Sequence, residues 1–189
     1  MVTLNPKVFV VMNFIAFQSV WLLAVKLQND GFLWLSLILF SHFLFSQHLA
    51  RDLLTIICIT FVGCLVDSAA SHFSIFYFAH DSLLPFWLII LWSYFSLTFH
   101  YSMSWLARFP VALQGVLGGV FGSLSYYSAY LLGAVDFPQG EQHTVFYLVV
   151  IWSLTLPVYV FIANTLAGKL NEKSNLISSI IKFSTPEKS

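Results

Sequence analysis

The sequence predicts an all-α membrane protein, a polytopic bundle of six transmembrane helices. Six long apolar stretches are separated by short polar breaks, and almost every charged residue lies in a break. Only 8% of the 189 residues are charged and 59% are hydrophobic, with a mean hydropathy of +0.84. A helix of about 20 apolar residues matches the roughly 30 Å hydrocarbon core of a bilayer, whereas soluble domains carry about 25% charged residues.

No polar stretch is long enough to form a soluble domain, so we expect one transmembrane domain over residues 1–168. Residues 169–189 would follow it as a cytoplasmic tail that is amphipathic at first and disordered at its end. The net charge is zero and no basic block occurs, which argues against a nucleic-acid partner. The partner that the composition does predict is the lipid bilayer.

The first three apolar stretches are bounded by turn-forming or charged residues. Asn5-Pro6 precedes the first stretch, and proline is tolerated at a helix start because its missing N–H needs no partner there. Gln28–Gly31 is a turn between the first two stretches, and Arg51-Asp52 separates the second from the third. The expected helices are 8–25, 32–49 and 53–70.

The last three stretches are separated in the same way. Arg108-Phe109-Pro110 divides the fourth from the fifth, and residues 136–140, which include a proline and a glycine, divide the fifth from the sixth. Pro157 within the sixth stretch predicts a kink and a freed backbone carbonyl. The expected helices are 83–106, 111–135 and 144–166.

Residues 72–82 leave two alternatives open. The aromatic run 74–78 is too short to span a membrane by itself. It either extends the third helix or lies in the membrane interface, with its aromatic rings at headgroup depth.

The distribution of lysine and arginine predicts the orientation. With six spans, one side of the membrane holds seven of these residues and the other side holds only Lys26. Because cytoplasmic loops are enriched in positive residues, both termini are expected in the cytoplasm. The seven residues are Lys7, Arg51, Arg108, Lys169, Lys173, Lys182 and Lys188.

Asp67 is the sharpest candidate for a functional side chain, because the third stretch around it is otherwise apolar. An ionisable group within a span costs a few kcal/mol, and such groups face the bundle interior or water. Gly63 and Ser71 share its helix face and leave room beside it. Asp67 is interpreted either as part of a proton, ion or ligand site or as an interfacial carboxylate that caps a loop.

Other polar candidates within the predicted spans are Asn13, His42 and His100. Histidine titrates near neutral pH and can relay protons. Such side chains also simply join helices by hydrogen bonds, each worth about 0.6 kcal/mol on average. No spacing of histidine, cysteine and acidic residues fits a metal site, and no phosphate-binding loop occurs, so no metal and no cofactor are expected.

The fifth stretch carries small residues at helical spacing. Small side chains let helix backbones approach closely in a membrane, so this row predicts a helix-packing face. The alternative is a groove in which a lipid or small ligand lies against the backbone. The row contains two overlapping GxxxG pairs and consists of Gly115, Gly118, Gly119, Gly122, Ser125, Ala129 and Gly133.

Several stretches together resemble a family of bacterial inner-membrane proteins known only as a domain of unknown function. The residues that carry the resemblance are Asn13, Phe17, Gln18 and Trp21, then Gly63 and Asp67, then Leu91-Trp92 and Trp105, and finally Gly122, Tyr126, Gly133, Ala134 and Val135. The chain departs from the family pattern at His100-Tyr101, where Asn-His is expected, and at Ser123, where proline is expected. The resemblance implies an integral membrane protein and adds Gln18 and Tyr126 to the candidate ligand or proton site.

The function stays open between three classes at this point. The protein could bind or move a small molecule or lipid. It could be an accessory subunit or an enzyme of membrane-lipid modification. It could also be a structural protein that assembles with another membrane protein or with a second copy of itself through the small-residue row.

Overall fold

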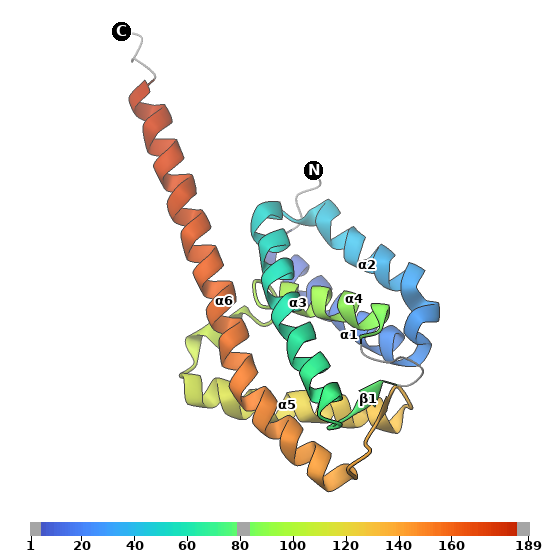
Figure 1. Ribbon diagram of the computed structural model, residues 1–189. Coiled ribbons are helices and arrows are strands. Elements are labelled where there is room, and N and C mark those ends of the chain that lie inside the picture. The colour runs from blue at the N-terminus through green and yellow to red at the C-terminus, as the bar shows by residue number, and fades with distance from the viewer. Residues whose placement is uncertain (1–4, 79–83, 185–189) are drawn as a thin grey trace.

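The computed structural model describes residues 5–78 and 84–184, and these residues form an almost wholly helical fold (Figure 1). The all-α class predicted from the sequence is therefore confirmed. The elements are α1 (Pro6–Leu27), η1 (Gln28–Gly31), α2 (Phe32–Phe45), α3 (Leu49–His72), β1 (Tyr77–Phe78), α4 (Phe86–Thr98), η2 (Ser104–Arg108), α5 (Val111–Leu131), β2 (Val135–Asp136) and α6 (Glu141–Ser184).

The structure supports fewer full membrane spans than the six that were expected. Three described segments are long and apolar enough to cross a bilayer: Pro6–Phe45, which contains α1 and α2, then Leu49–His72 and Glu141–Leu170. By contrast, α2 has 14 residues and α4 has 13, or about 20 Å of helix, which is less than the roughly 30 Å hydrocarbon core. The expected helix 83–106 is interrupted after Thr98 by turns and the separate 3₁₀ segment η2.

The short helix α4 lies at the centre of the fold. Nine of its 13 residues are buried, against four of 22 in α1, and it contacts α1, α2 and α3. A helix that is surrounded by protein need not be as long as the bilayer is thick, which explains why α4 stops early. Polar side chains on α4 are satisfied locally, because Ser93 and Thr98 donate to carbonyls of the preceding turn.

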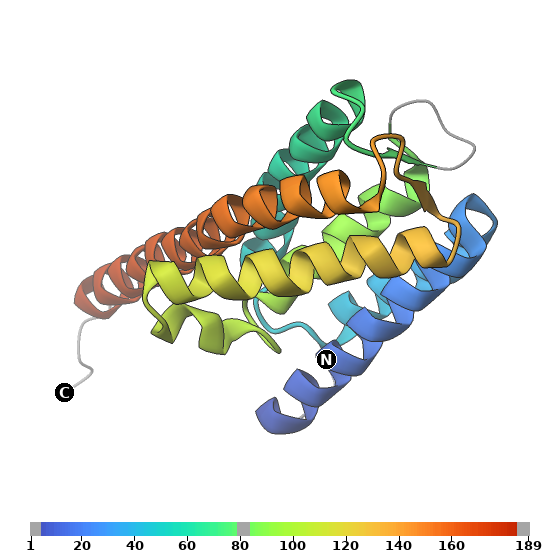
Figure 2. The ribbon, with the colours of Figure 1, turned by 90° about the horizontal axis from the view of Figure 1, so that it is seen from below.

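Helices α5 and α6 lie side by side (Figure 2), and glycines of α5 allow this contact. A Cβ added at Gly118 would overlap the Trp152 carbonyl, and one at Gly122 would overlap the Trp152 ring. Pro157 lies inside α6, and because proline has no N–H it leaves the carbonyl of Ser153 without its helical donor. The oxygen of that carbonyl faces Gly115 and lies 3.0 Å from the position that a Cβ would take there. It therefore faces a Cα–H of the glycine in place of a helical N–H.

Gly133 does not belong to this packing face, contrary to the sequence prediction. A Cβ there would meet nothing within 4 Å, and its φ of 76° is a left-handed conformation that favours glycine. Gly133 follows the end of α5 at Leu131, where its N–H bonds to the Tyr130 carbonyl. It therefore ends the helix.

The region after α3 does not extend that helix. The α3 helix ends at His72, and Tyr77–Phe78 forms an antiparallel pair with Val135–Asp136, in the register Phe78 opposite Val135. The loops on either side are also tied together, since Thr144 Oγ1 donates to the Ile75 carbonyl at 3.0 Å. The rest of the ambiguous segment, residues 79–82, lies outside the described residues.

The C-terminal helix does not end at residue 168, where the tail was expected to begin. Instead α6 runs on to Ser184, and its last part projects beyond the other helices (Figure 1). The expectation of a disordered end falls mainly on residues 185–189, which lie outside the described residues.

Candidate functional site

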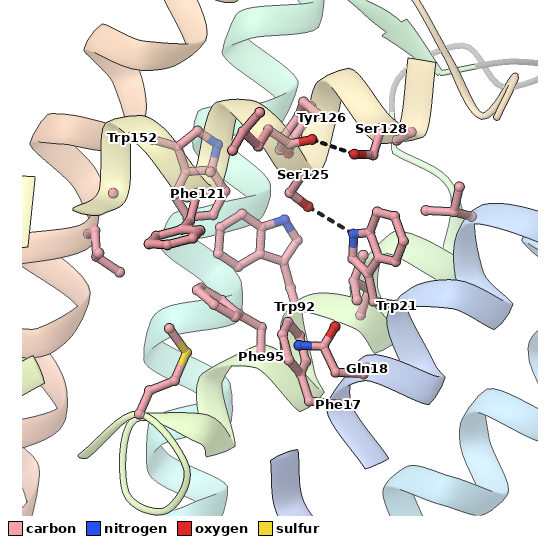
Figure 3. A pocket seen from close by; sticks show the side chains of 18 of the residues that line it. Phe17, Gln18, Trp21, Trp92, Phe95, Phe121, Ser125, Tyr126, Ser128 and Trp152 are labelled. Carbon is pink, nitrogen blue, oxygen red and sulfur yellow. Dashed lines mark hydrogen bonds between the residues drawn. The ribbon is translucent and has the colours of Figure 1, made fainter. Parts of the chain in front are cut away.

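A cavity of about 580 Å³ lies between α1, α4 and α5 (Figure 3). Its walls come from these three helices, one end from residues 102–106, and the other end from the strand partners Phe78 and Val135. Helix α6 contributes Trp152 and Leu156 behind the glycines of α5. The remaining lining residues are Phe14, Phe17, Gln18, Trp21, Val25, Trp87, Leu88, Leu91, Trp92, Phe95, Ser102, Met103, Trp105, Leu106, Leu117, Gly118, Phe121, Gly122, Leu124, Ser125, Tyr126, Ser128 and Ala129.

The lining is mainly apolar and rich in aromatic residues, with 11 aromatic side chains among 27 residues. The indoles of Trp92 and Trp152 are stacked, with ring centroids 5.7 Å apart and planes 7° apart, and Phe95 meets both rings edge-on. Gly122 makes this arrangement possible, because a side chain there would occupy the position of the Trp152 ring. The glycine row therefore both packs α5 on α6 and brings an aromatic surface to the cavity.

One hydrogen bond joins the two helices that flank the cavity. Trp21 Nε1 on α1 donates to Ser125 Oγ on α5 at 2.8 Å (Figure 3). Because the oxygen of Ser125 is the acceptor in this bond, its hydroxyl hydrogen remains available, and no acceptor for it lies in the described part of the chain. Both side chains are only partly buried.

Gln18 supplies the other polar group of the cavity wall. Its amide points into the cavity, near Trp21 and Trp92 (Figure 3), and the side chain is exposed. Among the described residues it has no hydrogen-bond partner. Gln18 lies about 18 Å along α1 from Pro6 and about 14 Å from Leu27, so it is near the middle of the helix. A polar amide at that depth costs free energy unless something bonds to it.

Asp67 lies behind the cavity wall rather than on it. Its carboxylate accepts from Trp92 Nε1 at 2.7 Å and from the Tyr126 hydroxyl at 2.6 Å, and the side chain is 4% exposed. Trp92 and Tyr126 line the cavity, whereas Asp67 does not. Gly63, one turn earlier on α3, has no side chain because the Trp92 ring occupies that space. The Gly-x-x-x-Asp pattern therefore accommodates the Trp92 indole: Gly63 leaves space for the ring, and Asp67 accepts the hydrogen bond from its N–H.

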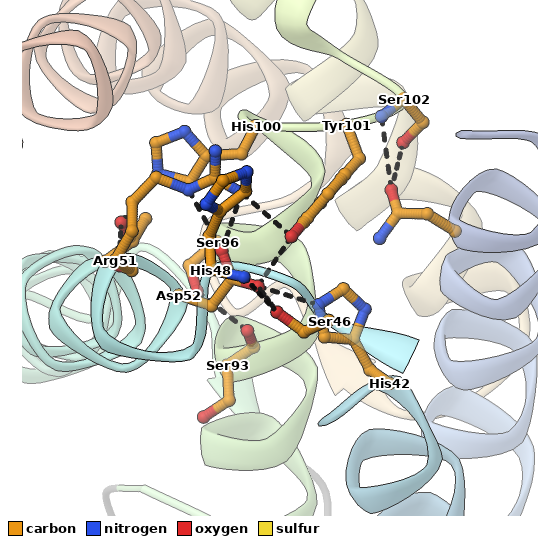
Figure 4. Close-up of polar contacts among 12 residues, drawn as sticks. His42, Ser46, His48, Arg51, Asp52, Ser93, Ser96, His100, Tyr101 and Ser102 are labelled. Atoms are coloured by element: carbon orange, nitrogen blue, oxygen red, sulfur yellow. Dashed lines mark hydrogen bonds and ion pairs between the residues drawn. The ribbon is translucent and has the colours of Figure 1, made fainter. Parts of the chain in front are cut away.

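A second buried carboxylate, Asp52, organises the opposite end of α3 (Figure 4). Asp52 is 0% exposed. Its Oδ2 accepts from Ser46 Oγ at 2.6 Å and from the Tyr101 hydroxyl at 2.7 Å, and it lies 3.2 Å from His42 Nε2. Its Oδ1 accepts from the guanidinium of Arg51 at 3.0 Å, and that guanidinium also donates to the Tyr101 hydroxyl at 2.8 Å.

The remaining candidates lie near this second carboxylate. His100 Nε2 is 2.7 Å from Thr55 Oγ1, next to Arg51, and burial, followed by the charge of Arg51, lowers the pKa of His100 to about 4. Asn13 accepts from the backbone N–H of Ser102 at 3.2 Å and from its hydroxyl at 2.6 Å. His42, His100 and Asn13 thus hold segments together near Asp52, whereas Gln18 and Tyr126 line the cavity.

Sequence reasoning missed Asp52, because Arg51-Asp52 looks like a charged break between two spans. The available signal was the polar spacing His42, Ser46 and Asp52, which brings three hydrogen-bonding side chains together across one tight turn. Among the described residues, no group of three or more histidine, cysteine or acidic side chains could hold a metal ion.

Comparison with known proteins gives one match. Residues 10–158 match the model of a family described as protein of unknown function (DUF2878). This confirms the resemblance to a domain of unknown function, and the matched range contains all of its motif residues. No curated protein and no solved structure matches the chain.

Proposed function

Because the chain belongs to the family described as protein of unknown function (DUF2878), we propose a function from the cavity itself: the protein binds a lipid-soluble small molecule within the membrane. The observation that carries this proposal is a cavity of about 580 Å³ lined by aromatic and aliphatic side chains with few polar groups. Ligand sites typically have volumes of about 300–1,000 Å³ and this kind of lining.

The position of the cavity supports a ligand that arrives from the lipid phase. Several lining residues on its two flanking helices are also exposed at the protein surface, including Phe14 at 52%, Phe121 at 64% and Leu124 at 52%. In a bilayer these side chains would meet acyl chains, so the cavity would open sideways to lipid. An apolar molecule dissolved in the membrane could then enter without crossing water.

The location that goes with this function is the inner membrane of a bacterium, with all six α-helices in the bilayer region and both termini in the cytoplasm. The support is the charge distribution, with seven of the eight lysine and arginine residues on one side of this topology. Reporter fusions after Lys173 should be active only for a cytoplasmic reporter, and fusions within residues 136–142 only for an outer one. A C-terminus outside the cytoplasm would contradict this arrangement.

The binding proposal is tested by filling the cavity. Leu117 on α5 lines it, and Leu117→Trp would occupy its volume. Leu113→Trp is the matched control, because Leu113 is on the same helix, is 38% exposed and does not line the cavity. We expect mass spectrometry to detect a hydrophobic molecule that co-purifies with the parent and the control but not with Leu117→Trp. The same bound lipids in all three samples would contradict the proposal.

A further inference from the structure

The polar groups of the cavity indicate which chemical class of molecule fits it. We propose that the ligand is a lipid-soluble molecule with a flat ring that carries carbonyl oxygens, the chemistry of a quinone, and that Gln18 binds one of those oxygens. This inference rests on the proposed function and narrows it. The evidence is of two kinds, the hydrogen-bond donors that lack acceptors and the shape of the aromatic walls.

Two side chains of the cavity wall have hydrogen-bond donors without an acceptor. The Gln18 amide can donate two hydrogens and the Ser125 hydroxyl one, and neither group has an acceptor in the described part of the chain. The two side chains lie on opposite flanks of the cavity, on α1 and α5 (Figure 3). A carbonyl oxygen accepts hydrogen bonds without donating one, so it could bind to either of these donors.

The walls favour a ring over a simple acyl chain. Phe17 and Phe95 lie with centroids 5.6 Å apart and planes 39° apart, next to the stacked indoles of Trp92 and Trp152. Aromatic faces interact favourably with other rings at such centroid spacings, beyond the apolar area that they bury. A saturated chain would gain only burial from them, and aliphatic side chains would serve it equally well.

The cavity also contains a built-in reporter for the experiment. Of the six tryptophans, five line it, and the sixth, Trp34, is 59% exposed on α2. In a Trp34→Phe background, every tryptophan lies at the cavity. Decylubiquinone, a benzoquinone with a ten-carbon tail, absorbs and quenches tryptophan emission, so its saturable binding can be followed directly. Decylbenzene has the same tail and a flat ring but no carbonyl, and its binding is measured by displacement of the quinone.

The test compares these two probes on the full chain in nanodiscs. We expect decylbenzene to bind about tenfold more weakly than decylubiquinone. Gln18→Leu keeps the side-chain volume but removes the amide. It should weaken the binding of decylubiquinone about fivefold, which corresponds to the loss of one hydrogen bond of about 1 kcal/mol, and leave the binding of decylbenzene unchanged. Gln47→Leu is the matched control, since Gln47 is exposed and does not line the cavity.

The outcomes separate this inference from the proposed function. If neither probe binds saturably, or if Leu117→Trp leaves both bound, the cavity is not a ligand site and both proposals fail. If both probes bind equally well, or if Gln18→Leu changes nothing while Leu117→Trp abolishes binding, only the quinone-like chemistry is wrong. A dimer that shields the cavity from both probes would mean that a second copy, not a small molecule, covers it.

Discussion

Asp52 and Asp67 lie about 22 Å apart along α3, and both are buried, but the protein surrounds them differently. Asp52 has a guanidinium partner in Arg51 and hydrogen bonds from Ser46 and Tyr101. Asp67 has two neutral donors, one indole and one phenol, and no cationic side chain bonds to it within the described ranges.

The difference concerns what each carboxylate holds together. The partners of Asp52 lie mostly within ten residues of it in the sequence, so its network fixes the turn between α2 and α3 and ties it to Tyr101. The partners of Asp67 are 25 and 59 residues away, on α4 and α5. Asp67 therefore positions two aromatic side chains of the cavity wall, while Asp52 anchors the turn between α2 and α3.

Removing the carboxylate with the charged partner should have the largest effect on stability. Asp52→Leu leaves Arg51 and His42 without their buried partner, so we expect the free energy of unfolding to fall by about 3 kcal/mol. Denaturation in mild detergent would measure this. Asp30→Leu is the control, because Asp30 is exposed. An equal loss of stability in both variants would contradict the anchoring role of Asp52.

A smaller change next to Asp67 should disturb the cavity directly. Gly63→Ala places a methyl group where the Trp92 ring lies, so we expect about 2 kcal/mol of destabilisation together with a change in tryptophan emission. Gly168→Ala is the control, since a Cβ there meets nothing within 4 Å and alanine favours helix. If Gly63→Ala were as stable as the parent, with unchanged emission, Gly63 would not be making room for Trp92.

Asp67→Asn should cost less in stability than either change but should affect binding. The amide oxygen can still accept from Trp92, but the amide nitrogen can only donate, so the Tyr126 hydroxyl would have to turn and accept. Both wall contacts are weakened, and we expect a loss of about 1 kcal/mol with insertion and fold retained. Retention of the cavity ligand should fall, because two wall side chains lose their fixed position. Unchanged ligand retention in mass spectrometry would mean that Asp67 has only a structural role.

A pH effect is expected at His100, close to the Asp52 network. The pKa of His100 is lowered to about 4, below the usual 6.5, so between these values the folded protein binds fewer protons than the unfolded chain. This contribution to stability is present above pH 6.5 and is lost as the pH falls towards 4. We expect the melting temperature to fall over that window, and less steeply in His100→Gln. If the melting temperatures of the two proteins fell equally over this pH window, His100 would not be the group responsible.

Much of the fold could be predicted because its signals are local. Apolar length and the Asn5-Pro6 and Pro110 boundaries placed the starts of α1 and α5 within a few residues. The break after Thr98 could not be found, because it lies within an uninterrupted apolar stretch and depends on burial of α4 among its neighbours. For the same reason the structure supports fewer full-length spans than the six that were predicted.

The candidate site was predictable only in part. Asp67 was found because a lone acid in an apolar stretch needs a partner, and the glycines of α5 were found by their spacing. The cavity was not, because its walls come from three helices that are distant in the sequence. Gln18 and Tyr126 entered only through the family resemblance, since neither differs locally from other polar residues in a membrane helix.

The strand pair of Phe78 and Val135 has a consequence for how a bound molecule would be exchanged. Both side chains are almost fully buried, and they cover the end of the cavity that they line. A molecule leaving between α1 and α5 would return to the bilayer and not to the aqueous phase. Occupancy would then follow the mole fraction of the ligand among the lipids, and every other protein in the same membrane that draws on this pool would compete for it.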